Sequence, residues 1–193
     1  MVRPPIYTIG YGKRSLEEFI ELLKRYKIEF LIDIRSQPYS RFRPEFSKAA
    51  LERRLEVDAI RYIFMGDTLG GRPGDETCYI DGKVDYALVR EKAFYHQGIA
   101  RLQTAWQRQL PVVLLCSEAR PQECHRGKLV GNTLMEQQIA VAHIDETGEI
   151  KTQHAINQDL TDGQLPLFEQ ESLITLSGKV GRSRKKRASK ESR

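Results

Sequence analysis

Short apolar runs alternate with segments of helical periodicity along this chain, and no other feature of the sequence constrains the fold as strongly. The runs expected to form strands are residues 6–9, 30–34, 60–64, 111–116 and 140–144. Helices are expected over residues 15–27, 47–55 and 86–109, and again from about residue 129. Strands separated by helices favour a parallel sheet covered on both faces. The sequence therefore predicts a three-layer α/β domain with a mostly parallel sheet of about five strands.

Local signals support parts of this assignment. Ser15 and Glu18 form the pattern of a capping box, which places a helix start after the first strand. Residues 66–85 are rich in Gly, Asp and Pro without a period, which predicts a long loop or a lid. Thr147 and Gly148 favour a small hairpin. His143 lies in mid-strand, where a hydrogen-bonded core histidine is the expected role.

The positive charge of the chain is concentrated at one end. The 31 Lys+Arg and 26 Asp+Glu give a formal charge of +5 and a pI near 9.1. The last sixteen residues hold eight basic residues and one acid, which leaves 23 basic and 25 acidic residues in the body. We therefore expect a folded domain over residues 1–158, then a linker and a flexible basic tail over 159–193. Such a tail either keeps the protein in solution or contacts the phosphate backbones of nucleic acid.

Composition also limits the cellular setting. The three cysteines are an odd number, which disfavours a disulfide framework and favours a reducing cytoplasm. No apolar run is long enough to span a bilayer, and no signal peptide is visible at the start. We expect a cytoplasmic protein with no membrane partner.

Polar clusters follow three of the predicted strands, and parallel strands would bring them to one edge of the sheet, where we expect a pocket. Asp33 could act in catalysis or pair with Arg35, which lies on the same strand face. Arginines suit a clamp for an anionic substrate because the guanidinium group binds phosphate in a bidentate manner. The residues expected to bind substrate are Tyr11, Lys13, Ser15, Arg35, Arg41 and Arg72.

The densest cluster follows the fourth predicted strand, with Cys116, Glu118, Cys124, His125 and Arg126 within eleven residues. In one interpretation Cys116 is a nucleophile and His125 or Glu118 moves protons. In a second, Cys116, Cys124 and His125 bind a transition metal, although a spacing of eight positions between the cysteines is not typical of a zinc knuckle. In a third, the two thiols form a reversible disulfide. A purely structural turn held by Glu–Arg pairs is also open.

Four blocks in this order, TIGYGKRSLEEF, DIRSQPYSRF, LGGRP and LLCSEARPQECHR, resemble the prokaryotic domain of unknown function family 488. The resemblance covers residues 6–143. It implies a compact α/β domain and no established reaction. By this resemblance the family's motif positions are Tyr11, Ser15, Asp33, Arg35, Cys116, Glu118, Cys124, His125 and Arg126.

A short motif lies between the domain and the basic tail. Gln164, Leu165, Leu167 and Phe168 resemble the peptide by which bacterial polymerases and repair proteins dock on the replication sliding clamp. In such a peptide the apolar side chains enter a pocket while the glutamine bonds at its rim. The alternative is that the same apolar side chains pack back on the domain.

These observations favour an enzyme that acts on nucleic acid or on a nucleotide-like anionic substrate, with DNA repair or processing as its context. The main alternative is a non-enzymatic adaptor that binds DNA or the sliding clamp. A more distant alternative is sulfur transfer of the rhodanese type, which also uses a cysteine in a loop at a strand end.

The clamp motif is testable with the full chain. We expect purified sliding clamp to retain the wild-type chain and to lose a variant carrying Leu167→Ala and Phe168→Ala, because these side chains supply the apolar contact. A control with Leu173→Ala, outside the motif, should be retained. Equal recovery of all three would remove the clamp proposal.

Overall fold

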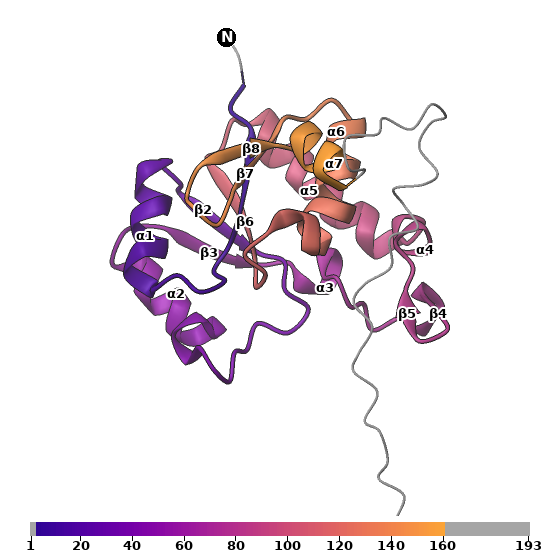
Figure 1. The fold of residues 1–193 in the computed structure, drawn as a ribbon, viewed down its shortest axis with the longest axis horizontal. Coiled ribbons are helices and arrows are strands. Elements are labelled where there is room, and N and C mark those ends of the chain that lie inside the picture. The colour runs from indigo at the N-terminus through magenta and orange to yellow at the C-terminus, as the bar shows by residue number, and fades with distance from the viewer. Residues whose placement is uncertain (1–2, 161–193) are drawn as a thin grey trace, which may run out of the picture.

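A six-stranded sheet forms the centre of the structure, a computed structural model that describes residues 3–160 (Figure 1). In spatial order the strands are β3 (Arg61–Phe64), β2 (Phe30–Asp33), β6 (Val112–Cys116), β1 (Ile6–Gly10), β7 (Val141–Ile144) and β8 (Ile150–Thr152). The first five are parallel and β8 is antiparallel to β7. The α/β prediction is therefore confirmed. The sixth strand is the second arm of the hairpin predicted at Thr147 and Gly148.

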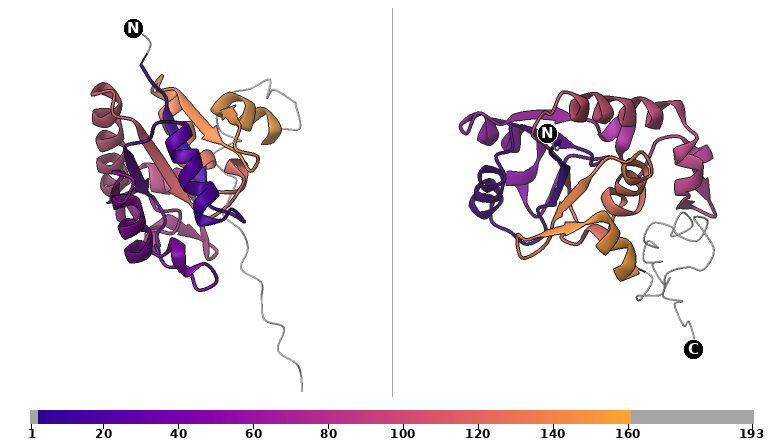
Figure 2. Two further views of the ribbon diagram at one scale, coloured as in Figure 1. Left: turned by 90° about the vertical axis from the view of Figure 1, so that its left-hand side faces the viewer. Right: turned by 90° about the horizontal axis from the view of Figure 1, so that it is seen from above.

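Helices cover both faces of this sheet, as the two views in Figure 2 show. Helices α1 (Leu16–Arg25) and α2 (Lys48–Glu56) pack on one face, against odd-numbered residues such as Leu31 and Val113. The opposite face packs Ile32 and Leu114 against a second group of helices. Its members are α3 (Gly66–Leu69), α4 (Tyr86–Arg90), α5 (Ala93–Gln107) and α6 (Asn132–Glu136). The period of two in the strands thus divides their side chains between two apolar cores.

The predicted capping box is present at the start of α1. The Ser15 hydroxyl accepts a hydrogen bond from the Glu18 backbone N–H at 3.1 Å, and the Glu18 carboxylate accepts from the Ser15 backbone N–H at 2.7 Å. These bonds satisfy two backbone donors that no helical carbonyl can reach. The first strand and the first helix are thereby joined by a short, well-determined turn.

The interpretation of residues 66–85 as a structureless loop is wrong. This segment contains α3, the short helix η2 (Glu76–Cys78) and a small hairpin of β4 (Tyr79–Ile80) and β5 (Lys83–Val84). It is anchored because Leu69, Cys78 and Val84 are buried in the core. Elements of two to four residues are too short to show a period in the sequence.

The long helical region predicted before β6 is divided into α4 and α5, because Lys92 between them has an extended backbone. After β6 the chain forms the short helix η3 (Pro121–Glu123) and then η4 (Arg126–Gly131), which is a π-helix. Helix η1 (Pro44–Phe46) precedes α2, and α7 (Gln153–Leu160) follows β8. Helices of the π type are rare and often occur at functional sites.

No helix within residues 3–160 has the length and apolar character needed to cross a bilayer. The motif around Gln164 and the basic tail lie outside the described residues.

A buried polar chain links β1, β7, α7 and η4. The Thr8 hydroxyl bonds His143 Nδ1 at 2.7 Å, and His143 Nε2 bonds the Gln153 side-chain oxygen at 2.7 Å. The Gln153 amide nitrogen in turn donates to the carbonyl of Gly127 at 3.2 Å. Because that carbonyl can only accept, the Gln153 oxygen must face His143, and His143 Nε2 must carry the proton. This confirms the expectation of a hydrogen-bonded core histidine.

Burial of His143 makes stability depend on pH. Burial lowers its pKa from 6.5 to about 4, with the Gln153 bond opposing the shift. Between these values the unfolded chain binds a proton that the folded chain does not, so the free energy of unfolding falls as the pH falls. Above pH 6.5 the histidine is neutral in both states and has no such effect.

We expect a His143→Gln variant to lose less unfolding free energy than the wild type between pH 7 and pH 4.5, by about 2 kcal/mol. Urea denaturation at the two pH values measures this difference. The matched control is His154→Gln, because His154 is exposed. The explanation fails if the His143 and His154 variants show the same pH dependence.

Candidate functional site

The candidate site lies at the carboxyl ends of β2 and β6, where the topology of the sheet predicts a crevice. Asp33 pairs with Leu115, so the two strands end at the same level. From there β2 leads to α2 on one face of the sheet, while β6 leads to η4 and α6 on the other. Neighbouring parallel strands whose connections diverge in this way leave a crevice at their carboxyl ends, which is the usual ligand site of open α/β sheets.

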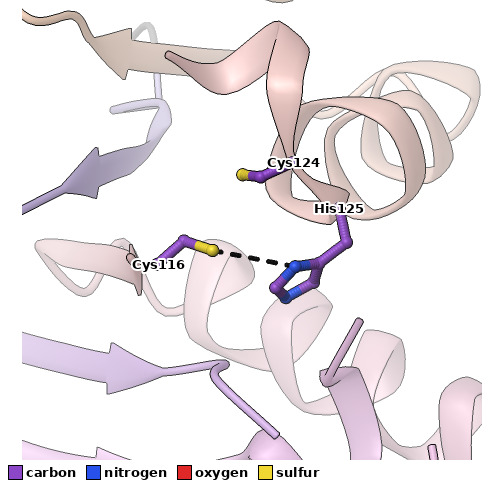
Figure 3. Close-up of side chains that lie close together, drawn as sticks. All are labelled: Cys116, Cys124 and His125. Carbon is purple, nitrogen blue, oxygen red and sulfur yellow. Dashed lines mark hydrogen bonds between the residues drawn. The ribbon is translucent and has the colours of Figure 1, made fainter. Parts of the chain in front are cut away.

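Cys116 is the last residue of β6, and its thiol points toward the ring of His125 (Figure 3). Its Sγ donates a hydrogen bond to Glu118 Oε2 at 2.8 Å and lies 3.7 Å from His125 Nδ1. The side chain is buried, with 2% of its surface exposed. A thiol and an imidazole are therefore within reach of each other in a buried place, as a nucleophile and its base would need to be.

His125 is held in one orientation by the backbone of β2. Its Nε2 lies 2.9 Å from the carbonyl oxygen of Ile34. A carbonyl can only accept, so Nε2 carries a proton, and Nδ1, which faces Cys116, is free to accept one. The ring is also fixed sterically, because a Cβ on Gly71 would lie 2.6 Å from Nδ1. The segment LGGRP thus packs directly on the imidazole.

Burial keeps the Cys124 thiol protonated. Burial raises the pKa of the Cys124 thiol well above 9, and hydrogen bonding and charge at Cys116 act in the same direction. Cys124 therefore remains a thiol at neutral pH unless a metal ion displaces the proton. Of these two cysteines, Cys116 is the better candidate for a nucleophile.

The same three side chains fit a metal ion. The two sulfur atoms and a ring nitrogen of His125 lie within 4.8 Å of one another, all buried. Thiolates and imidazole suit zinc and similar ions, and a metal-bound histidine normally donates its other N–H to a carbonyl, as Nε2 does here to Ile34. All three cysteines of the chain are free, and the predicted reversible disulfide stays a prediction.

Glu118 is ionised although it is largely buried. Burial acts to raise its pKa, but hydrogen bonds from the Cys116 thiol and a backbone N–H, with the charges of His125 and Arg126, lower it below its ordinary value. A carboxylate with a lowered pKa is a weak base. Glu118 is thus better suited to hold the thiol than to remove its proton.

Arg126 organises the loop that carries Glu118. The guanidinium group is fully buried and donates to the carbonyls of Glu118 at 2.9 Å and Ala119 at 2.7 Å. Gly10 is needed beside it, since a Cβ there would lie 1.7 Å from the Glu118 carbonyl oxygen. The structure therefore places Arg126 beneath the loop, where it contacts backbone, and a role in catalysis stays a prediction.

Asp33 and Arg35 form a buried, bidentate ion pair on the other wall of the crevice. Arg35 Nε and Nη2 donate to the Asp33 carboxylate at 2.8 and 2.5 Å, which confirms the ion-pair alternative. Tyr62 donates to the same carboxylate at 2.6 Å. Arg35 also lies 5.6 Å above the ring of Tyr11, which stacks on Phe46. Arg35 Nη1 is buried and has no hydrogen-bond partner among residues 3–160.

The other residues predicted to bind substrate have exposed side chains or stabilise the fold. Ser15 caps α1. Lys13, Arg41 and Arg72 have exposed side chains, and the backbone of Arg72 donates to the Ser36 hydroxyl at 2.8 Å. The four residues of the predicted clamp motif lie beyond residue 160, so the structure does not test them.

Several contributors to the site were not predicted from the sequence. They are the carbonyl of Ile34, the phenol of Tyr62 and the nearby phenol of Tyr86, whose pKa is raised by burial and by Cys124 and Cys116. Gly71, which packs on His125, was also not predicted as a site residue, but the sequence did point to its segment, because LGGRP is one of the four blocks that carry the family resemblance.

Comparison with protein-family models matches residues 15–132 to the family described as Domain of unknown function DUF488, and the chain belongs to that family. Searches of curated proteins and of solved structures found no match. The matched region includes β2, β6 and η4, and thus the whole crevice. Because the family description names no reaction, function must be argued from the site itself.

The packing of Gly71 on His125 predicts a specific cost. We expect Gly71→Ala to lower the free energy of unfolding by about 1–3 kcal/mol, because the added methyl group overlaps a ring that is held on its other side. Gly74→Ala is the matched control, since a Cβ there meets no atom within 4 Å. Urea denaturation compares the two, and equal losses would contradict the assignment.

Proposed function

We propose that this member of the DUF488 family is a thiol-dependent enzyme that acts on a nucleotide-like anionic substrate. Cys116 is the nucleophile and His125 is its base. The observation that carries the proposal is the Cys116–His125–Ile34 arrangement, in which the Nε2 bond to the carbonyl directs Nδ1 toward the thiol. A nucleophile next to a base that a third group orients is the recurring arrangement of covalent catalysis.

In this mechanism the proton of Cys116 passes to His125 Nδ1. The sulfur electron pair then forms a bond to an electrophilic atom of the substrate, and the leaving group departs with its bonding pair. The leaving group takes the proton from Nδ1, which restores neutral imidazole. A water molecule then gives a proton to Nδ1 and attacks the same substrate atom, the bond to sulfur breaks with its electron pair on Cys116, and the thiolate recovers the proton from Nδ1. The Ile34 carbonyl stabilises the imidazolium formed on the way, because it accepts from Nε2 in both protonation states.

Binding of an anion is supported by the opposite wall of the crevice. Arg35 is buried and keeps one guanidinium nitrogen, Nη1, without a partner among the described residues. Asp33 neutralises its charge and fixes its plane through two hydrogen bonds. A free N–H in such a dry, pre-arranged position favours a substrate oxygen that carries negative charge.

A metal centre at Cys116, Cys124 and His125 is the second candidate, because these three donor atoms converge within 4.8 Å. A metal ion bound to Cys116 would prevent the thiol from acting as a nucleophile, so the two candidate functions exclude each other. Metal analysis of protein purified without chelator or affinity tag distinguishes them. A stoichiometric metal that is lost in Cys124→Ser would favour the centre, whereas a metal-free wild type would favour the free thiol.

For the free thiol we expect iodoacetamide at pH 7 to alkylate Cys116 faster than Cys78 or Cys124, whose pKa values are raised by burial. His125→Ala should slow the reaction at Cys116 by about tenfold or more, because the base is lost. Mass spectrometry of digested samples taken over time gives the three rates.

The matched control is His96→Ala, which removes an exposed histidine from α5. Two results would contradict a thiol nucleophile activated by His125. In one, Cys116 reacts no faster than the other two thiols; in the other, Cys116 reacts at the same rate in the His125 and His96 variants.

A further inference from the structure

The loop between β2 and η1 presents two aromatic side chains to solvent. Phe42 is 89% exposed and Tyr39 is 72% exposed, and no other aromatic residue within 3–160 is in the exposed class. A single exposed apolar side chain is ordinary, but two large aromatic side chains in one loop form a candidate contact surface. Most of the surface of both residues is open to solvent.

This exposure is not the result of a loosely held loop. The Ser40 backbone N–H donates to the Ser47 hydroxyl at 3.1 Å, and the Arg43 backbone N–H donates to the Ser40 hydroxyl at 3.2 Å. At the start of α2, the Lys48 backbone N–H donates to the Pro38 carbonyl at 2.8 Å. The backbone on both sides of the two rings is therefore fixed while the rings themselves point outward.

Four exposed cations surround the same loop. Arg41 lies between the two aromatic residues in the chain, and Lys48 follows at the Pro38 contact. On one side Arg43 Nη1 donates to the carbonyl of Gly12, next to Lys13. On the other side Arg72 is joined to the loop through Ser36. We call Lys13, Tyr39, Arg41, Phe42, Lys48 and Arg72 the aromatic–basic rim.

One cation of this rim, Lys48, lies over an aromatic ring, with its Nζ 5.2 Å from the ring centroid of Phe64. Within the described part of the chain, none of the four takes part in an ion pair. The nearest acidic residue along the loop, Glu45, is already paired with Arg43 at 2.6 Å. Since the body of the protein has a slight excess of acidic residues, this local positive surface is a specific feature and not part of a general basic character.

We propose that the aromatic–basic rim binds single-stranded nucleic acid, with bases stacked on Tyr39 and Phe42 and phosphates held by the four cations. The combination of exposed aromatic faces and unpaired cations is what unpaired strands require, because their bases offer free π-faces next to a charged backbone. A duplex hides those faces and would use only the cations.

This inference rests on the proposed function, since it names the substrate class of the same site. The loop that carries the rim starts at Ile34 and Arg35. The carbonyl of Ile34 orients His125, and Nη1 of Arg35 is the N–H without a partner that is proposed to bind an anion. A strand bound on the rim therefore lies next to the residues that hold His125 and Arg35 in place.

The test is fluorescence polarisation with a labelled 12-nucleotide single-stranded DNA, the RNA of the same sequence and the corresponding DNA duplex. All proteins are full-length, so that the basic tail is identical in each. We expect Tyr39→Ala combined with Phe42→Ala to weaken single-strand binding about tenfold or more and duplex binding much less. Val57→Ala is the control, because it removes an apolar side chain that is 79% exposed just after the end of α2.

Replacing Lys13 and Arg41 by Ala should make single-strand affinity less dependent on salt, because fewer counterions are released on binding. The inference is overturned if the aromatic double variant and Val57→Ala bind single strands equally, or if the double variant loses single-strand and duplex binding to the same extent. If these two variants bind single strands equally, the rim is instead a contact surface for a protein partner.

Cys116→Ser separates this inference from the proposed function. The serine variant should bind single strands as the wild type does, because the rim does not include the thiol. Loss of rim binding with a reactive Cys116 would contradict only the inference. A normal rim with an unreactive Cys116 would contradict only the thiol mechanism.

Discussion

The register of β2, β6 and β1 is the constraint on which the candidate site depends. Backbone pairing aligns Asp33 with Leu115 and Gly10 with Cys116, so that three strands end at one level. A slip of β6 by one residue would turn Cys116 to the other face of the sheet and exchange the residues of the two cores. Because both cores are apolar and closely packed, the burial that stabilises the sheet also fixes the position of the thiol.

Backbone carbonyl groups then help to hold the side chains of the site in place. The carbonyl of Ile34 orients His125, and the carbonyls of Glu118 and Ala119 accept from the buried Arg126. These groups belong to strands and to a loop held against them, so the fold itself fixes their positions. Such pre-arrangement is valuable in catalysis because no reorganisation is needed during the reaction. The flexible, exposed cations remain at the rim, where binding and not chemistry is expected.

The features that were predicted from the sequence are those that depend on local periodicity. The features that were missed are contacts between residues far apart in the chain. Strands, their order of alternation with helices, and the Ser15–Glu18 cap follow from local patterns, and the cluster from Cys116 to Arg126 is contiguous in the chain. The Tyr62 bond to Asp33 joins residues 29 positions apart on paired strands, which no local pattern reveals. The carbonyl of Ile34 carries no signal, since every residue has one. Residues 66–85 were misjudged because burial, and not periodicity, holds their short elements.

The protonation of His125 tests the central claim most directly. Long-range ¹H–¹⁵N NMR at neutral pH, with the His125 signals assigned through a His125→Ala variant, identifies which ring nitrogen carries a proton. The account predicts a proton on Nε2, held by the Ile34 carbonyl, with Nδ1 directed at Cys116. An Nε2 without a proton would contradict it, because the imidazole would then have no bond to β2 and no reason to face the thiol.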